Sequence, residues 1–204
     1  MSSGGLRERK KQKTKASIQR EALRLFKKKG YDETTIEDIA AAAEISPSTF
    51  FNYFPSKEDV VIYDEYDPQL FASLMAQSDQ PLGQSIRDAV DAMAGVFAGD
   101  RDAIYERAKL SLEVPELRAR TWEELEKAQN QFVAVIASRT GLEATNFEVR
   151  VVALALVGAA FEAALEWVRL GGRGSMLDLF NRALDAIEFY PMLEKLKRGA
   201  AGAS

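Results

Sequence analysis

Apolar residues recur along most of the chain at the three- and four-residue spacing of amphipathic helices. The first such stripe, within residues 13–29, consists of Ile18, Ala22, Leu25 and Phe26. Longer stripes predict helices over residues 81–98, 101–114, 116–139, 147–170 and 175–189. Gly99, Pro115, Gly141, the glycines of 171–174 and Pro191 separate these helices. No segment sustains the alternation of a β-strand, so the sequence predicts an all-α chain.

Short helices are expected between residues 34 and 66. Thr34 and Glu37 have the spacing of a capping box for a helix over 35–43. Ser46 is a good N-cap for a second helix, over 47–53, and Ser56 for a third that continues to about residue 66. Only residues 44–46 join the first two helices. Such a short joint makes them cross steeply, which is typical of a helix-turn-helix.

Composition removes many enzyme classes. The chain has 204 residues and contains neither Cys nor His. Disulfides, thiol nucleophiles, Ser–His triads and His- or Cys-liganded metals are therefore excluded. We expect a protein that is not an enzyme, with no cofactor and no metal site. The N-terminus lacks the apolar core of a secretory signal, and the apolar stretch 151–168 carries Glu162 and Glu166. A buried helix is therefore expected rather than a membrane span, in a cytoplasmic protein.

Charge is distributed unevenly along the chain. Residues 1–30 contain 11 basic and 2 acidic side chains, a net charge of +9, and the other 174 residues contain 16 basic and 29 acidic ones, a net charge of −13. A basic head on an acidic body favours a polyanionic partner at one end. A solvated tail without a partner is the alternative.

Residues 26–58 combine aromatic, small and hydroxyl side chains in a dense pattern. It reads Phe26-x3-Gly30-Tyr31-x2-Thr34-Thr35-Ile36-x2-Ile39-Ala40-x2-Ala43-x-Ile45-Ser46 and continues as Ser48-Thr49-Phe50-Phe51-x-Tyr53-Phe54-x-Ser56-Lys57-Glu58. This pattern resembles the DNA-binding domain of TetR-type bacterial transcriptional regulators. Two positions depart from it, because Glu44 stands where the family usually has Gly and Phe51 where it commonly has Tyr.

The resemblance implies an N-terminal three-helix helix-turn-helix domain followed by a helical ligand-binding and dimerisation domain. We expect a basic flexible arm over 1–12, the DNA-binding domain over 13–56, the second domain over 57–198 and a disordered tail over 199–204. The implied function is a homodimeric repressor that binds an inverted-repeat operator in double-stranded DNA and is released by a small apolar or acyl-CoA-like ligand. The alternative is a DNA-binding regulator or activator without a small-molecule switch.

Residue chemistry and the resemblance together suggest roles in DNA binding. Ser48, Thr49 and Asn52 are expected to read bases, with Phe51 against a thymine methyl group. Phosphate contacts are expected from Thr35, Tyr53, Lys57 and the basic arm. The full set of expected DNA-contacting residues is Thr35, Ser46, Ser48, Thr49, Phe51, Asn52, Tyr53, Lys57, Arg7, Arg9, Lys10 and Lys11.

The second half of the chain suggests a dimer interface and a ligand pocket. Segment 147–170 is apolar around almost its whole circumference, so a helix there must be buried on both sides. The expected dimer residues are Val152, Ala155, Ala159, Ala163, Phe180 and Leu184, with ordinary core packing as the alternative. The expected ligand-binding residues are Phe71, Met75, Met93, Phe97, Tyr105, Trp122, Asn130 and Phe161. Segments 49–54 and 64–68 resemble a subgroup that senses acyl-CoA-like molecules.

Overall fold

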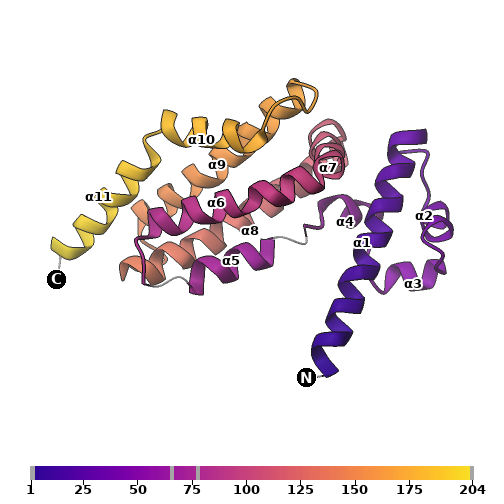
Figure 1. Cartoon of the computed structure of the whole chain (residues 1–204), viewed down its shortest axis with the longest axis horizontal. Helices are drawn as coiled ribbons and strands as arrows, with labels where there is room; N and C mark the ends of the chain where they lie inside the picture. The colour runs from indigo at the N-terminus through magenta and orange to yellow at the C-terminus, as the bar shows by residue number, and fades with distance from the viewer. Residues whose placement is uncertain (1–2, 65–66, 77–78, 203–204) are drawn as a thin grey trace. The chain divides into compact units, whose positions relative to one another are not determined.

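The computed structural model describes residues 3–64, 67–76 and 79–202, and these segments contain helices and no strand. The predicted all-α class is therefore confirmed. The helices, labelled in Figure 1, are α1 Ser3–Lys29, α2 Ile36–Ala42, α3 Pro47–Phe51, α4 Lys57–Ile62, α5 Asp67–Ala76, α6 Leu82–Gly99, α7 Arg101–Glu113, α8 Pro115–Thr140, α9 Phe147–Arg169, α10 Met176–Ala186 and α11 Phe189–Gly202.

The chain forms two compact units. Unit 1 consists of residues 1–65 and 102–121, and unit 2 consists of residues 66–101 and 122–204. The N-terminal unit is larger than the 13–56 domain expected from the sequence, because α4 and the start of α8 complete its core. Val60, Val61 and Leu117 are buried there with Phe26 and Phe50.

Helix α1 begins at Ser3 and runs to Lys29, so the structure differs from the flexible arm expected over residues 1–12. Residues 6–13 are Leu, Arg, Glu, Lys and Gln, all of which are good helix formers. Thr14 donates from its hydroxyl to the Lys10 carbonyl at 3.0 Å, a bond that a helical side chain makes to the preceding turn.

The helix-turn-helix lies in α2 and α3. The α2 capping box is formed by Thr35 and Asp38, one residue later than predicted. Thr34 is instead buried, and its hydroxyl donates to the Gly30 carbonyl at 2.7 Å. In the turn, Glu44 adopts a φ of 56°, a left-handed conformation that costs a side-chain-bearing residue about 1–2 kcal/mol. Ser46 then caps α3, because its hydroxyl accepts from the Thr49 amide at 3.1 Å.

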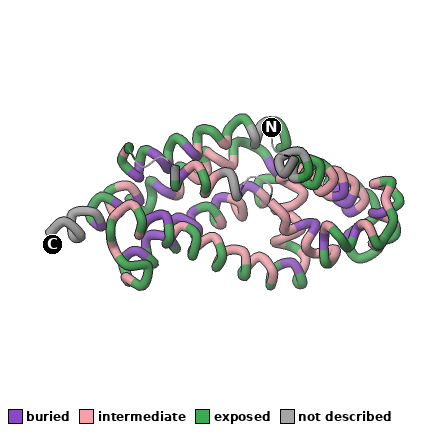
Figure 2. The backbone as a smooth tube through the Cα atoms, turned by 90° about the horizontal axis from the view of Figure 1, so that it is seen from below, coloured by how far each residue is buried: buried purple, intermediate pink, exposed green. Residues whose placement is uncertain are grey.

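Helix α9 supplies much of the core of unit 2. Its buried residues are Val149, Val152, Ala153, Leu156, Val157, Ala159, Ala163 and Trp167. By length and composition alone α9 could cross a membrane, but this inner side packs in the protein core against residues of α10 and α11. Buried residues alternate with exposed ones along the helices in Figure 2.

The C-terminal helices depart from the sequence prediction. The helix expected over 175–189 is α10, which ends at Ala186, and a further helix that was not predicted, α11, begins at Phe189. Glu188 lies between them and has a φ of 49°. Pro191 lies in the first turn of α11, where its missing N–H removes no intrahelical bond. Helix α11 then continues to Gly202, into the segment expected to be a disordered tail.

Candidate DNA-binding surface

Helix α3 has one buried and one exposed side. Phe50 is 0% exposed and Phe54, just beyond the helix, is 1% exposed, and their rings pack 6.0 Å apart. On the other side Ser48, Phe51 and Asn52 are exposed, with Phe51 at 53%. The buried aromatic residues therefore fix α3 while three predicted base-reading side chains face solvent.

Hydroxyl groups cluster at the start of α3. The Ser46 oxygen lies 2.9 Å from the Ser48 hydroxyl and 2.8 Å from that of Thr49. Ser46 and Ser48 are exposed and Thr49 is half-buried. Tyr53, expected to contact phosphate, is half-buried against the core of unit 1. The cluster can donate to and accept from either base edges or phosphate oxygens.

Two predicted phosphate contacts have structural partners within the chain. The Lys57 ammonium donates to the carbonyls of Tyr31 at 2.8 Å and Thr34 at 3.3 Å, and it lies 4.1 Å from the centre of the Tyr31 ring. The Thr35 hydroxyl is part of the α2 cap. Sequence reasoning missed the role of Lys57 because its partners, Tyr31 and Thr34, lie far from it in sequence, and it missed that of Thr35 because it placed the α2 cap one residue earlier.

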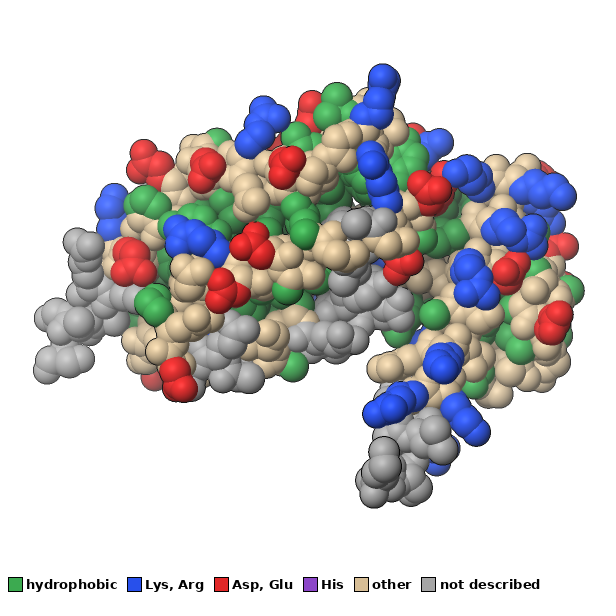
Figure 3. Space-filling model, viewed as in Figure 1, with side chains coloured by type: hydrophobic (Ala, Val, Ile, Leu, Met, Phe, Trp, Pro, Cys, Tyr) green, Lys and Arg blue, Asp and Glu red, His purple; other side chains and the backbone are tan. Residues whose placement is uncertain are grey.

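The basic residues of α1 lie on an exposed helical surface. Arg7, Arg9, Lys10 and Lys11 are all exposed. Lys and Arg side chains gather along this helix in Figure 3. Lys15, one turn further along, is held over the rings of Phe54 at 5.1 Å and Tyr63 at 4.3 Å. The more N-terminal cations therefore form a basic strip on a helix that is anchored near α3 and α4.

Ionised groups also support α2. Lys29 pairs with Asp38, and hydrogen bonds from Lys29 and from the Thr35 backbone and hydroxyl hold the pKa of Asp38 well below its ordinary range. Asp38 is thus ionised at neutral pH and completes the α2 cap. Nearby, burial and the Glu58 carboxylate, which accepts from the Tyr31 hydroxyl at 3.1 Å, raise the pKa of Tyr31.

Residues from the middle of the chain hold α4, which follows α3. Arg107 donates to the Val61 carbonyl at 3.1 Å and to Asp64 at 3.0 Å. Arg120 donates to Asp59 at 2.7 Å, and Lys27 pairs with Glu106 at 2.9 Å. Nothing in the sequence spacing pointed to these pairs.

The dimer residues expected from the sequence need correction. Val152, Ala159, Ala163 and Leu184 are at most 7% exposed within the single chain, so they cannot form the surface that meets a second copy. Val152 and Ala159 of α9 and Leu184 of α10 lie in the core cluster of unit 2. Ala155 and Phe180 are half-buried.

The expected ligand residues do not line one pocket. Trp122 and Phe161 do come together, with ring centres 5.9 Å apart, in a groove of about 500 Å³ between α8 and α9. We call this the Trp122 groove. The other expected residues are dispersed: Phe71 packs on Phe132, Met93 is half-buried, Met75 and Asn130 are exposed, Tyr105 belongs to unit 1, and the Phe97 side chain lies outside the described residues.

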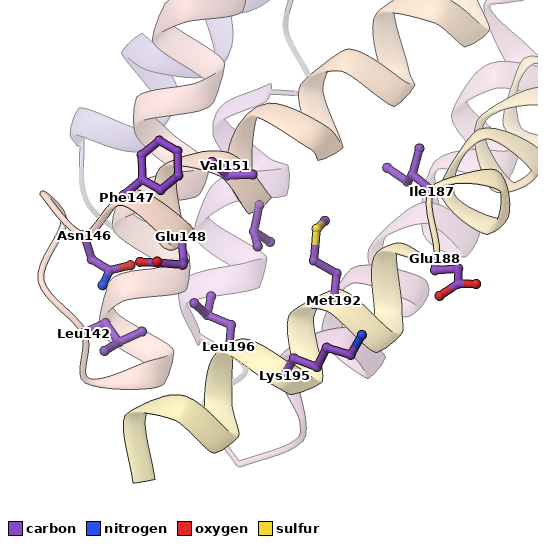
Figure 4. Close-up of a pocket in the computed structure, with 11 residues that line it drawn as sticks. Leu142, Asn146, Phe147, Glu148, Val151, Ile187, Glu188, Met192, Lys195 and Leu196 are labelled. Carbon is purple, nitrogen blue, oxygen red and sulfur yellow. The ribbon is translucent and has the colours of Figure 1, made fainter. Parts of the chain in front are cut away.

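A larger groove, of about 750 Å³, lies between the start of α9 and helices α10 and α11. Figure 4 shows Phe147 and Val151 on its α9 side, and Met192 and Leu196 on α11. Phe147 is 74% exposed, and Ile187 at its edge is 43% exposed. Sequence reasoning missed this surface, because it followed the small residues of α9 rather than the large ones on its outer side.

Comparison with known proteins agrees with this architecture. Residues 18–63 match the family described as "Bacterial regulatory proteins, tetR family", and residues 80–189 match the "MftR C-terminal domain". The chain is 33% identical over 149 residues to the HTH-type transcriptional regulator TcmR of Streptomyces glaucescens, an alignment that covers 68% of this chain and 66% of that protein. It is 27% identical to the putative mycofactocin biosynthesis transcriptional regulator MftR of Mycobacterium tuberculosis, over 88% of this chain and 95% of that one.

Solved structures show the same fold. Thermus thermophilus FadR, a TetR-family repressor determined in complex with lauroyl-CoA, has 26% identity and a TM-score of 0.53, covering 84% of this chain and 91% of its own. FadR from Bacillus halodurans has a TM-score of 0.61 at 19% identity, over 88% and 94% of the two chains. The matched domains and relatives are transcriptional regulators, not enzymes. The chain therefore belongs to the TetR family of transcriptional regulators.

Proposed function

We propose that this regulator is a homodimeric repressor that binds an inverted-repeat operator through α3 and is released by a small ligand. The observation that carries the proposal is the two-sided α3, in which buried Phe50 and Phe54 present exposed Ser48, Phe51 and Asn52. A protein of this kind works in the cytoplasm, where the chromosome lies.

The exposed side of α3 suits a sequence with A·T pairs. Asn52 is an amide that can bond an adenine at two positions, and the Phe51 ring can contact a thymine methyl group. The Ser46, Ser48 and Thr49 hydroxyls serve either bases or phosphates. No described side chain on this surface of α3 is charged, so salt-dependent attraction has to come from elsewhere.

The basic strip of α1 supplies that attraction. Because Arg7, Arg9, Lys10 and Lys11 are on a helix, they would lie along phosphates: a helix about 10 Å across is wider than the minor groove of about 6 Å. Lys57 contributes mainly by fixing the Tyr31–Thr34 segment next to α2.

For the dimer we propose the outer surface of the larger groove in place of the inner side of α9. Phe147, Val151 and Ile187 expose apolar groups there, at 74%, 40% and 43%. An exposed apolar patch of large side chains is typical of an interface. Two copies related by a twofold axis match an inverted-repeat operator.

For the effector we propose a small apolar or acyl-CoA-like molecule. The support is the likeness to Thermus thermophilus FadR, which was determined with lauroyl-CoA. A ligand that binds one conformation of the body better than another lowers operator affinity by that difference. A regulator without such a switch is the second candidate, favoured by the scatter of the expected ligand residues.

The deciding experiment is enrichment of sheared genomic DNA on the purified protein, with and without lauroyl-CoA. An inverted repeat that is recovered alone and lost with lauroyl-CoA supports the whole proposal. A repeat that persists supports DNA binding and rejects release by an acyl-CoA. Failure to enrich any sequence at moderate salt would refute the assignment of α3.

Replacement of Asn52 by Ala sharpens this test. We expect Asn52→Ala to lose discrimination at one base position per half-site, worth about 1–3 kcal/mol, while binding elsewhere in the site is kept. Asn181→Ala, at an exposed asparagine of α10, is the matched control and should bind like the wild type. Unchanged base preference in Asn52→Ala would place recognition on other residues.

A further inference from the structure

Glu44 lies in the turn between α2 and α3, in a conformation that favours glycine. Its φ of 56° is left-handed, which glycine adopts freely and a residue with a side chain adopts at a cost. Backbone bonds hold the turn. The Glu44 amide donates to the Ala41 carbonyl at 3.2 Å, and the next amide, that of Ile45, donates to the Ala40 carbonyl at 2.9 Å. Neither bond involves the Glu44 side chain, so forming the turn does not require a carboxylate.

The charge of Glu44 is also unfavourable at this end of α2. The helix ends at Ala42 and its C-cap is Ala43, so Glu44 follows the helix terminus that carries a partial negative charge. The last turn of α2 contains no basic residue. The Glu44 side chain is exposed and has no hydrogen bond or ion pair within the described chain. A strained residue that its surroundings do not stabilise is a candidate for a role in function.

Glu44 is close to the surface proposed to contact DNA. It precedes Ser46 by two residues, and the Ser46 hydroxyl belongs to the cluster formed with Ser48 and Thr49. Two residues span at most about 7 Å of chain. This length is comparable to the Debye length of about 8 Å at physiological salt, so salt only partly screens a charge at Glu44 from phosphates at this surface.

The neighbouring elements do not offset this charge. Helix α3 contains no charged side chain, and the Lys57 ammonium is engaged by the carbonyls of Tyr31 and Thr34. The cations that attract DNA in the proposed function belong to the basic strip of α1. Attraction by this strip and repulsion by Glu44 therefore act on the same duplex from two separate elements.

We propose that Glu44 is a repulsive determinant of the DNA-binding surface. Its carboxylate repels the phosphates nearest to the start of α3 and lowers the affinity for a duplex of any sequence. The inference rests on the proposed function and names how the affinity of that same site is set. A ligand commonly changes the affinity of a second site by about 5–150-fold, so a weakened operator complex is easier for a ligand to release.

The test compares the wild type with Glu44→Gln, which keeps the size of the side chain and removes its charge. Fluorescence anisotropy measures binding of the full-length protein to its operator duplex and to a random-sequence duplex of the same length. We expect Glu44→Gln to bind both duplexes about tenfold more tightly at about 0.1 M salt, with about threefold from each copy of a dimer. The gain should shrink as the salt concentration rises, because ions screen the repulsion.

Further variants separate the charge from the backbone strain. Glu44→Asp keeps the carboxylate and should bind DNA like the wild type, whereas Glu44→Gly removes charge and strain together and should bind like Glu44→Gln. Asp91→Asn is the matched control. Asp91 is an exposed carboxylate of α6 in unit 2, without a hydrogen bond or ion pair within the described chain, so its removal should leave DNA affinity unchanged. Thermal melts followed by circular dichroism show whether each variant is folded.

Three results would overturn the role of Glu44. Equal affinities of the wild type and Glu44→Gln would show that the carboxylate does not repel DNA. Weaker binding of Glu44→Gln to the operator alone would show that Glu44 accepts from a base, as a carboxylate can from the amino group of cytosine. An equal gain in Asp91→Asn would show an effect of net charge alone.

Operator binding by the wild type separates this inference from the proposed function. If the wild type binds its operator and any of these three results is obtained, the role of Glu44 is wrong and the repressor proposal stands. If neither the wild type nor a folded variant binds any duplex, the proposed function fails, and the role of Glu44 fails with it.

Discussion

In unit 1, polar side chains from α1, α7 and α8 bond to both ends of the short helix α4. In unit 2, bonds of this kind, such as those from Arg139 to the carbonyls of Leu74 and Gln80, accompany long helices that pack mainly through apolar side chains. Gln19 donates to the carbonyls of Val60 and Tyr63, both at 2.8 Å, and Arg120 holds Asp59 at the other end of α4. In unit 2 the core is formed by branched and aromatic residues such as Leu156 and Phe189.

The difference matches the two tasks of a regulator. Hydrogen bonds have a narrow range of good distances and angles, so they fix α4 in one arrangement. Apolar contacts are less directional and tolerate repacking. Under the proposed function, unit 1 is the rigid unit that contacts DNA and unit 2 is the unit that adapts to a ligand.

The largest effect should come from removing the central ring of unit 1. Phe50 is 0% exposed, so Phe50→Ala should destabilise this unit by about 3–5 kcal/mol. Both tryptophans, Trp122 and Trp167, belong to unit 2. Circular dichroism should therefore show an early partial transition in urea while Trp fluorescence changes at the wild-type midpoint. If the circular dichroism and Trp fluorescence transitions both shift to lower urea together, the two units unfold as one and do not differ in the way described above.

A smaller effect is expected from one of the polar ties. Arg120→Ala removes the pair with Asp59, and since the Arg120 side chain is 42% exposed the loss should be about 1 kcal/mol. Hydrogen exchange of the α4 amides measures it. Arg118→Ala is the control, because Arg118 is exposed and has no ion pair within the described chain. Equal protection of the α4 amides from hydrogen exchange in the two variants would show that the Arg120–Asp59 pair does not stabilise unit 1.

Acid should weaken unit 1 through Asp38. The folded pKa of Asp38 lies below that of an unfolded Asp, about 3.9, so its contribution is present above that pH and is lost as the pH falls through the folded value. We expect Asp38→Asn to flatten the decline of unit 1 stability between about pH 5 and pH 2. Thermal melts followed by circular dichroism across this range test it, and identical pH profiles would contradict the role of the Lys29–Asp38 pair.

The smallest effect on stability is expected from relieving backbone strain. Each unit contains one glutamate with a left-handed φ angle, so the two positions can be compared directly. Glu44 in unit 1 and Glu188 in unit 2 both have left-handed φ angles, 56° and 49°. Glu44→Gly and Glu188→Gly should each stabilise their own unit by about 0.5–1 kcal/mol, after the entropy cost of glycine is deducted. Urea midpoints read by the two optical probes measure this. A loss of stability in either variant would mean that the Glu side chain compensates the strain.

Much of the fold could be predicted because apolar residues recur every three to four positions along an amphipathic helix. The ends of both helices of the helix-turn-helix were predicted to within two residues. The cap of α2 is at Thr35 rather than Thr34 because the Thr34 hydroxyl donates to the Gly30 carbonyl. Helix α11 was missed because Pro191 was interpreted as a boundary after the preceding helix, whereas it lies in the first turn of α11. Contacts such as Arg107–Asp64 join residues far apart in sequence and leave no periodic signal.

The candidate sites were predicted less well, for a related reason. A row of small residues such as Ala159 and Ala163 indicates that something approaches closely, but not whether it belongs to the same chain. Here neighbouring elements of the same unit fill that role. The exposed side of α3 could be predicted from helical spacing. Phe50 and Phe54 are four residues apart and lie on the buried side, whereas Ser48 and Asn52, also four apart, lie on the exposed side.

Helix α8 belongs to both units, since residues 115–121 lie in unit 1 and 122–140 in unit 2. Arg120, which holds α4, and Trp122, which lines the groove, are therefore on one continuous helix. Inserting a single residue between them would turn the later side chains of α8 by about 100° around the helix axis relative to Arg120. Homologous chains should accordingly vary in loop length on either side of α8 while keeping the number of residues within this stretch constant.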